Sequence, residues 1–298
     1  MIKVNDVSKS FGGFKALDSL DLNVKKGSIY GLVGTNGSGK TTIIKHLTGV
    51  YRQDSGDITY GGESVYDNEK VKAGIGFIPD EFYFFNGYNL KDMALFTKRT
   101  HKNWNQAIFD EMIGAFNLDP RGRVSRFSKG MQKQAVFALT MASKPDYLIL
   151  DEPIDGLDPV VRRKVWSYIV NDVSEREMTV LVSSHNLREM EGICDSIGIL
   201  ARGKMILERD LDELKTDIHK VQVAYKDRNQ SVYDGVNILH KESRGAVDLL
   251  IIKDKKELVI EKLKAGNPLI FDILPLTLEE IFIYELGGES NEIQSIIL

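Results

Sequence analysis

The segment GTNGSGKT (34–41) restricts the possible folds of this chain more than any other stretch. It directly follows a strand-length apolar run, SIYGLVG (28–34), and it leads into TTIIKHLTGV (41–50), which has the composition of a helix. The spacing is that of a glycine-rich loop that binds phosphate between a strand and a helix. Its glycines let the backbone N–H groups approach an anion, and the N-terminus of the helix adds a favourable dipole. We therefore predict a phosphate-binding loop in an α/β domain.

Four further apolar runs have the length of strands. They are GIGFIPD (74–80), DYLILDE (146–152), MTVLVSSH (178–185) and SIGIL (196–200). Runs that are apolar on successive residues are typical of strands buried on both faces of a parallel sheet. Helical patterns separate several of them, and in 161–173 one helical stripe is formed by Val161, Val165, Trp166, Ile169, Val170 and Val173. The alternation predicts an α/β fold with a mostly parallel sheet.

The segment 88–145 contains no strand-like run. Within it, WNQAIFDEMIGAF places Trp104, Ile108, Met112 and Phe116 four residues apart, on one face of a helix. We therefore expect a domain over residues 1–216 that carries an all-helical subdomain at about 88–145.

The composition changes after about residue 217, where short strand patterns alternate with helical ones. The strand patterns are HKVQVAYK (219–226), AVDLLIIK (246–253) and LIFDIL (269–274), and the helical patterns are KKELVIEKL (255–263) and TLEEIFIYEL (277–286). We expect a small α+β module over residues 217–298, with a mobile tail from Gly287 onward.

The bulk composition excludes several classes of protein. A formal net charge of −4 over 298 residues gives no electrostatic reason to expect a nucleic acid partner. The single cysteine, Cys194, allows no disulfide within the chain, which fits a reducing compartment. The N-terminus lacks a signal-peptide pattern, and no apolar run approaches the roughly 18 residues that a membrane span needs. A soluble cytoplasmic protein is expected, with any membrane role exercised through a partner.

Polar side chains follow the predicted strands where each strand ends. Lys40 can bridge the β- and γ-phosphates of a nucleotide, and the Thr41 hydroxyl can bind Mg²⁺. Asp151 suits a Mg²⁺ position, and Glu152 suits a general base for water. Open α/β sheets bind ligands beyond the carboxyl ends of their strands. One crevice is therefore expected to hold the phosphate-binding loop, Asp80, Asp151, Glu152 and His185.

Several motifs, taken in order, resemble those of the ATP-binding cassette ATPases over about residues 1–215. GTNGSGKT is similar to Walker A, YLILDE to Walker B, GLDP (156–159) to the D-loop, FSKGMQ (127–132) to the signature motif and SFGGFKAL to the A-loop, and SSH ends in a residue similar to the switch histidine, His185. The resemblance implies Mg²⁺-dependent ATP hydrolysis by Glu152 and His185. It implies nucleotide contacts for Phe11, which would stack on adenine, and for Gly34, Thr35, Asn36, Gly37, Ser38, Gly39, Lys40, Thr41, Thr42, Ser128, Gly130 and Asp158. It implies metal contacts for Thr41, Asp80 and Asp151.

The stretch RFSKGMQKQ (126–134) begins like a helix with a serine cap and an accessible glycine, which makes a second anion-binding end. In the resembled family, two cassettes hold two ATP molecules between them head to tail. Ser128 and Gly130 would therefore bind the γ-phosphate of the partner's ATP. Lys129 and Met131 depart from the usual glycine and glutamine of this motif. A plain helix cap is the alternative outside this context, and the partner can be a second copy or a different cassette.

Asp80 stands where the family usually has the Q-loop glutamine. Its carboxylate can bind Mg²⁺, but without screening it would repel the γ-phosphate, so its contact with the metal stays open. The next residues, EFYFFNGY (81–88), crowd five aromatic rings together. They form either the core of the helical insert or a surface groove for a helix of a membrane partner, which is where the family docks its permease.

The resemblance favours the ATPase subunit of an exporter, which would dimerise on ATP at the cytoplasmic face of the membrane and drive a separate transmembrane permease. PLTLEEIF (275–282) is similar to the ending of single-cassette ATPases that serve such permeases, and FSKGM is a signature variant common among them. Two alternatives stay open: an importer ATPase, and a soluble cassette ATPase that acts on ribosomes or DNA. A P-loop kinase would leave FSKGMQ and GLDP without a role.

Overall fold

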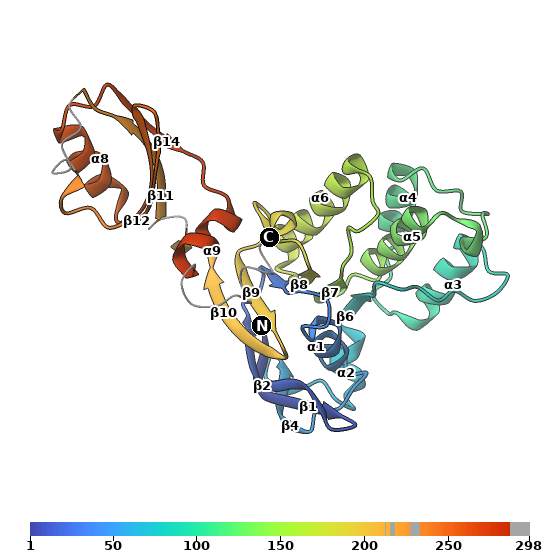
Figure 1. Ribbon diagram of the computed structural model, residues 1–298. Coiled ribbons are helices and arrows are strands. Elements are labelled where there is room, and N and C mark those ends of the chain that lie inside the picture. The colour runs from blue at the N-terminus through green and yellow to red at the C-terminus, as the bar shows by residue number, and fades with distance from the viewer. Residues whose placement is uncertain (212, 215–217, 227–232, 287–298) are drawn as a thin grey trace. The chain divides into compact units, whose positions relative to one another are not determined.

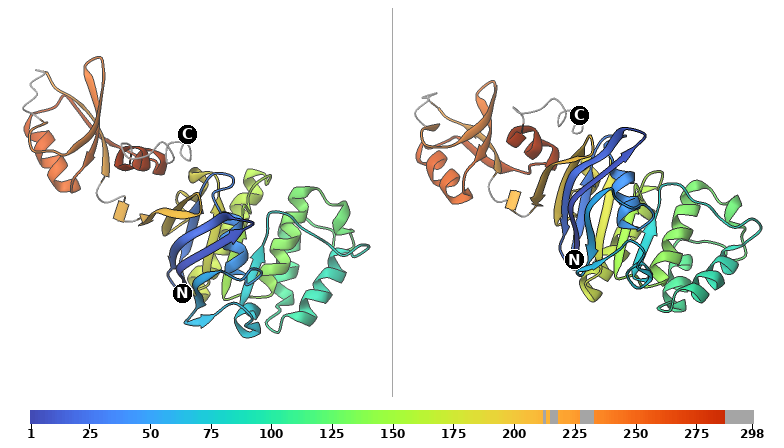
Figure 2. Two further views of the ribbon diagram at one scale, coloured as in Figure 1. Left: turned by 60° about the horizontal axis from the view of Figure 1, so that its bottom comes forward. Right: turned by 90° about the horizontal axis from the view of Figure 1, so that it is seen from below.

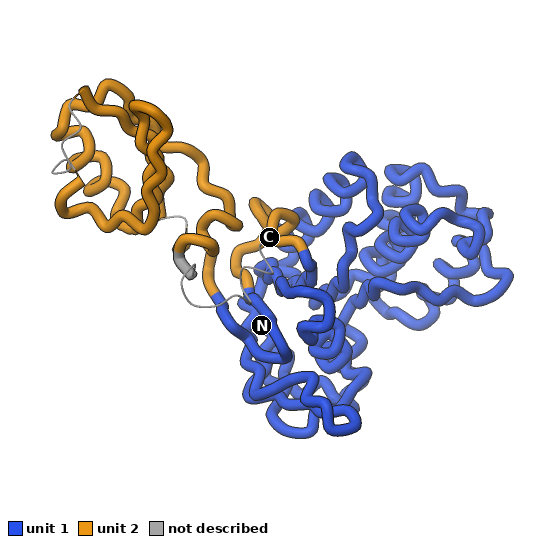
Figure 3. Tube along the Cα trace, viewed as in Figure 1, with its two compact units in different colours: residues 1–185, 198–208 blue, residues 186–197, 209–298 orange. Residues whose placement is uncertain are grey.

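The computed structural model describes residues 1–211, 213–214, 218–226 and 233–286. The chain divides into two compact units, one of residues 1–185 and 198–208 and one of residues 186–197 and 209–298 (Figure 3). These two units are defined by contacts within the structure, whereas we placed a domain boundary at residues 216/217 from a change in composition. That boundary stays a prediction.

A six-stranded sheet carries the predicted site. Its strands, in the order β10-β9-β3-β8-β7-β6, are β10 (Lys204–Asp210), β9 (Ser196–Ala201), β3 (Ile29–Val33), β8 (Thr179–Ser184), β7 (Tyr147–Asp151) and β6 (Ile75–Ile78). The neighbours β3 and β8, β8 and β7, and β7 and β6 run parallel. All residues of β3, β8 and β9 are buried, as expected for strands covered on both faces. The five strands predicted from apolar runs are confirmed.

A second, antiparallel sheet lies at the N-terminal end of the chain, and the sequence did not lead us to expect it. Its strands, in the order β2-β1-β4-β5, are β2 (Phe14–Val24), β1 (Ile2–Phe11), β4 (Ser55–Tyr60) and β5 (Glu63–Ser64). The pairing of β1 with β2 changes register at three places. Such bulges interrupt the alternation of buried and exposed residues that identifies a half-buried strand.

Helix α1 (Lys40–Leu47) connects the two sheets through one hydrophobic core. Its buried Ile43, Ile44 and Leu47 belong to the same cluster as Ile2 of the antiparallel sheet and Leu181 of the parallel one. The core therefore holds the start of α1 firmly at the end of β3, where the phosphate-binding loop lies.

The segment 88–145 is helical. It contains α3 (Leu90–Thr100), α4 (Gln106–Ala115), a 3-10 turn η1 (Val124–Arg126) and α5 (Lys129–Ala142), and these helices lie together at one side of the first unit (Figures 1 and 2). Side-chain caps start all three helices: Asn89 accepts from the Asp92 N–H, Asn105 from Ala107 and Ile108, and Ser128 from Met131. Polar caps at the helix starts and buried residues between them explain why this segment forms helices.

Two further helices of this unit are α2 (Glu69–Ala73) and α6 (Pro159–Arg176). The stripe predicted in 161–173 lies on α6, where Val165, Trp166 and Ile169 are buried. Val170 is 43% exposed, so it does not belong to the buried face.

The described residues of the second unit include the turn η2 (Leu187–Met190) and an antiparallel sheet with the helices α8 (Lys256–Ala265) and α9 (Leu278–Leu286). The strands, in the order β12-β13-β11-β14, are β12 (Ile238–Arg244), β13 (Val247–Lys253), β11 (Ile218–Ala224) and β14 (Ile270–Leu274). Val259 and Leu263 of α8 pack on Val221 and Leu250 of the sheet. The three predicted strands and both helices are present. We missed β12, because most of its residues are polar and exposed at the sheet edge. The tail from Gly287 lies outside the described residues.

Among the described helices, none is both long enough and apolar enough to cross a membrane.

Candidate functional site

A cavity of about 320 Å³ lies at the start of α1, beside the ends of β6 and β7. It is lined by Phe14, Ala16, Thr35, Asn36, Gly37, Gly39, Lys40, Thr41, Thr42, Asp80, Asp151 and Glu152. The structure thus brings together the glycine-rich loop and three of the four polar side chains that we expected at the carboxyl ends of the strands.

Glycine is required at several positions of the loop. Gly37 and Gly39 have φ angles of 80° and 112°, in the left-handed region that side chains disfavour. Gly34 has an ordinary φ, but a Cβ atom there would lie 2.4 Å from the Leu200 carbonyl oxygen and 2.5 Å from Ser38 Oγ. The loop therefore packs closely against β9 at Gly34. Gly37 and Gly39 have no side chain to cover the backbone that lines the cavity.

Lys40 is a buried cation inside this loop. Its Nζ donates to the carbonyl oxygens of Gly34 at 2.6 Å and Thr35 at 3.3 Å, and it lies 3.4 Å from Glu152 Oε1. The ammonium group therefore lies between the loop and the carboxylate of Glu152, the predicted general base. An anion bound in the cavity would be attracted by the positive charge of Lys40, which lines it.

Asp151 and Glu152 are ordered by one hydroxyl group from the neighbouring strand. Ser183 Oγ donates to Asp151 Oδ1 at 2.6 Å and accepts from the Glu152 N–H at 3.2 Å. Glu152 has a φ of 48°, which is unusual for a residue with a side chain and marks local backbone strain. The turn at the end of β7 thus brings two adjacent carboxylates to one cavity, with Asp151 and the Glu152 backbone both held by Ser183.

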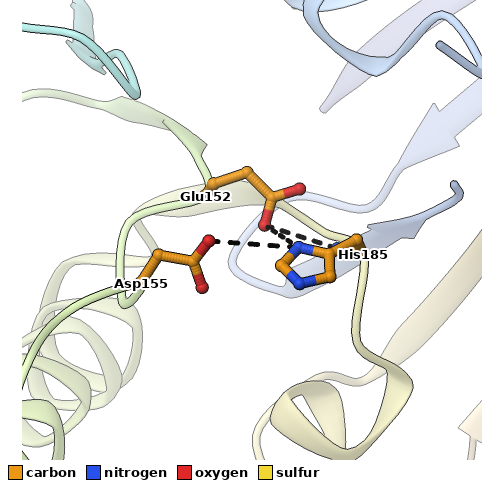
Figure 4. Close-up of side chains that lie close together, drawn as sticks. All are labelled: Glu152, Asp155 and His185. Atoms are coloured by element: carbon orange, nitrogen blue, oxygen red, sulfur yellow. Dashed lines mark hydrogen bonds and ion pairs between the residues drawn. The ribbon is translucent and has the colours of Figure 1, made fainter. Parts of the chain in front are cut away.

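His185 lies directly against Glu152, as Figure 4 shows. Its backbone N–H and its Nδ1 lie 3.3 Å and 3.0 Å from Glu152 Oε2. The ring nitrogen must donate in this bond, because a carboxylate only accepts. Asp155 Oδ2 lies 4.0 Å from the same ring nitrogen. One oxygen of Glu152 thus faces Lys40 and the other faces His185, which holds the carboxylate in place.

Phe11 and Phe14 take different positions. Phe11 packs edge-to-face on Tyr51, with a centroid distance of 5.6 Å, and it is absent from the lining of the cavity. Phe14 lines the cavity together with Ala16 and is 69% exposed. From the sequence we expected Phe11 to contact the nucleotide, and we missed both Phe14 and Ala16. Residues 14 and 16 are two apart in a strand, and alternate residues of a strand share a face, so this spacing could have indicated that both side chains face the cavity.

Ser128 and Gly130 lie at the start of α5 and are absent from the cavity lining given by the described residues. Ser128 Oγ accepts from the Met131 N–H at 3.3 Å. A Cβ atom on Gly130 would lie 3.4 Å from the Gly156 carbonyl oxygen. Asp158 caps α6 by accepting from Val160 and Val161 at 3.0 Å and 3.1 Å. The start of α5 is therefore a capped helix terminus that does not belong to the cavity of the chain's own phosphate-binding loop, and its binding of an anion stays a prediction.

The aromatic segment after Asp80 is partly buried and partly exposed. Phe82, Tyr83 and Phe84 help to line a cavity of about 290 Å³ between β6 and the helices α3 and α5. Tyr83 is 90% exposed, Phe85 50% and Tyr88 40%. None of the five rings belongs to the buried core, so the core interpretation is not supported, and docking of a membrane partner stays a prediction.

A family model and two curated relatives all identify the chain as similar to ATP-binding proteins of ABC transporters. Residues 17–155 match the family model described as ABC transporter. The chain is 32% identical over 290 residues to the ABC transporter ATP-binding protein YtrB of Bacillus subtilis, with 97% of this chain and 99% of YtrB covered. It is 34% identical over 236 residues to the bacitracin transport ATP-binding protein BcrA of Bacillus licheniformis, which covers 78% of this chain and 77% of BcrA.

Solved structures show the same fold. The dimeric structure of MJ0796, a bacterial ABC transporter cassette, superposes with a TM-score of 0.64 at 21% identity. The match covers 71% of this chain and 99% of MJ0796.

Proposed function

This chain belongs to the ATP-binding cassette (ABC) transporter family and is an ATP-binding ATPase, and from that premise we propose that it powers an exporter through a separate membrane permease. The similarity to BcrA, a bacitracin transport ATP-binding protein, supports the transport role. The observation that carries the ATPase step is the position of Glu152, between Lys40 of the phosphate-binding loop and His185. A carboxylate in that position can accept a proton from water beside a bound triphosphate.

We propose that the loop amides and Lys40 bind the phosphates of ATP. Lys40 already makes hydrogen bonds to two loop carbonyl oxygens and lies near a carboxylate, so its charge is directed into the cavity. Glu152 would act as the base, and His185 would orient it through Oε2. The strained backbone of Glu152 supports this role, because such strain often occurs at functional residues.

The donor set beside the loop fits Mg²⁺. Thr41, Asp80 and Asp151 offer a hydroxyl and two carboxylates at one cavity, and hard oxygen ligands are those that Mg²⁺ prefers. Asp151 is buried and keeps one oxygen on Ser183, which fixes the other. A bound Mg²⁺ would neutralise charge on the phosphates. We propose Thr41 and Asp151 as its principal ligands, with Asp80 near it.

We propose that Phe14, rather than Phe11, stacks on the adenine. Phe14→Ala is expected to weaken ATP binding by about 5- to 150-fold, because a stacked base contributes about 1–3 kcal/mol. Phe11→Ala, the matched control, is expected to leave the affinity nearly unchanged, because its ring packs on Tyr51. Equilibrium titration with ATP measures both, and inorganic triphosphate, which has no base, should bind all three proteins alike. The opposite order of the two variants would return the stacking role to Phe11.

We propose further that two cassettes bind two ATP molecules between them, with Ser128 and Gly130 facing the partner's nucleotide. The separation of this helix end from the chain's own cavity supports the proposal. The dimeric structure of the MJ0796 cassette, which shares the fold, supports it also.

The permease is expected to bind the exposed aromatic residues after Asp80. Replacing Tyr83 and Phe85 with serine should abolish co-purification with a co-expressed, multiply spanning neighbour-gene product while leaving basal ATPase activity intact. The two rings are 90% and 50% exposed and are absent from the nucleotide cavity lining. Leu269→Ser, which changes an apolar residue of the second unit that is 70% exposed, serves as the control. Retention of the chain on ribosomes or DNA, with no membrane partner, would contradict the proposal and favour the non-transport alternative.

A further inference from the structure

A buried lysine on α5 lies beside the site and has no role in the mechanism proposed above. The side chain of Lys133 is only 10% exposed. Its Nζ donates to the backbone carbonyl oxygen of Glu152 at 2.8 Å and lies 3.7 Å from Asp80 Oδ1. A buried ammonium group is costly unless it is paired and hydrogen-bonded, so these two contacts account for its position.

The two partners come from neighbouring strands of the parallel sheet. Asp80 follows β6, Glu152 follows β7, and β6 and β7 pair directly. Lys133 comes from the helical segment, one turn after Ser128 and Gly130. This single side chain of α5, the helix that begins in the signature motif, therefore contacts the residues that follow two neighbouring strands.

The contact with Glu152 restrains the proposed base. Ser183 Oγ accepts from the Glu152 N–H, and Lys133 donates to the Glu152 carbonyl oxygen. The backbone of a residue with a φ of 48° is thus hydrogen-bonded on both sides. Loss of either bond would remove one restraint on the backbone that sets the direction of the Glu152 side chain toward Lys40 and His185.

The contact with Asp80 concerns charge. Asp80 lines the nucleotide cavity and, together with Lys133, also a neighbouring cavity of about 570 Å³. A carboxylate at the nucleotide cavity repels a triphosphate. Lys133 offsets that charge, although the effect is moderated by solvent because the Asp80 side chain is 59% exposed.

We propose that Lys133 is a positioning residue for ATP hydrolysis, which anchors the backbone of Glu152 and neutralises Asp80. The proposal rests on the role of Glu152 as base. It makes catalysis sensitive to the position of α5, because a shift of the signature helix would move Lys133 from both strand ends together.

The test separates the two contacts through kcat and KM. Lys133→Met keeps length and removes charge, and we expect kcat to fall about 10- to 100-fold through misplacement of the base. KM for ATP is expected to rise because Asp80 is left unpaired. Adding Asp80→Asn should return KM to the value of the Asp80→Asn single variant while kcat stays low, since Glu152 still lacks its anchor. Lys98→Met, which changes an exposed lysine of α3, should leave both constants at wild-type values.

Folding of each variant is checked by thermal unfolding. If Lys133→Met does not fold, Lys133→Arg replaces it: KM should stay near wild type because the charge remains, and kcat should fall because a planar guanidinium does not reproduce the bond to Glu152. Wild-type kcat and KM in the folded variant would overturn the proposal. Full rescue of kcat by Asp80→Asn would overturn the anchoring of Glu152. Undiminished hydrolysis by Glu152→Gln would instead refute the role of Glu152, and ATP affinity would still test the contact with Asp80.

Discussion

Glu152→Gln is expected to lower the rate of ATP hydrolysis by about 10²- to 10⁴-fold, the usual contribution of a general base. The amide keeps the shape of the side chain and can still accept a hydrogen bond from Lys40 or from His185 through its one oxygen, but it does not accept the proton of the attacking water. ATP binding should persist, because the loop and Lys40 are unchanged. An ATP-bound dimer should therefore accumulate, which phosphate release and size-exclusion chromatography with ATP would measure together.

Glu69→Gln is the matched control for this variant, because it makes the same chemical change at an exposed position on α2. It should hydrolyse ATP at the wild-type rate and should show no accumulated dimer. Hydrolysis at the wild-type rate by Glu152→Gln would remove this residue from the catalytic role.

Mixing two inactive variants is expected to restore ATP-dependent dimerisation if the signature end acts on the partner's nucleotide. Lys40→Ala removes the cation from the loop, and Gly130→Asp places a carboxylate where phosphate would bind. The Gly130→Asp chain should still fold, because a Cβ atom there meets the Gly156 carbonyl oxygen at an ordinary contact distance of 3.4 Å. In a mixed dimer, one site has both defects and the other joins an intact loop to an intact signature end.

Each variant alone should remain monomeric with ATP, because every site in its homodimer carries one defect. The 1:1 mixture should form a dimer, visible by analytical ultracentrifugation, even if turnover stays low. Failure of the mixture, in a protein whose wild type self-associates, would contradict action on the partner's nucleotide. If the wild type does not self-associate, the same cross is made with a second cassette chain, and failure there has the same meaning.

The sequence alone determined the parallel sheet and most of the phosphate site. Strands buried on both faces are apolar on successive residues, and this local pattern identified β3, β6, β7, β8 and β9. The loop at 34–41 needs no distant residue to be recognised, because its glycine spacing and its place between strand and helix are local. Asp80, Asp151 and Glu152 could be placed at the same crevice because parallel strands end on one edge.

Only the tertiary structure decided the features that depend on contacts between distant residues. The antiparallel strands β1 and β2 are interrupted by bulges, and β12 is a polar edge strand, so none of the three has a clear hydrophobic period in the sequence. We propose Phe14 in place of Phe11 for the adenine contact because Phe14 lines the cavity and Phe11 does not, and strand geometry rather than motif position decides which ring faces the cavity. Ser183 reaches Glu152 across 31 residues and Lys133 reaches it across 19, through pairing of strands and packing of α5. Contacts of this kind leave no local pattern, because they arise only when the whole chain brings separate elements together.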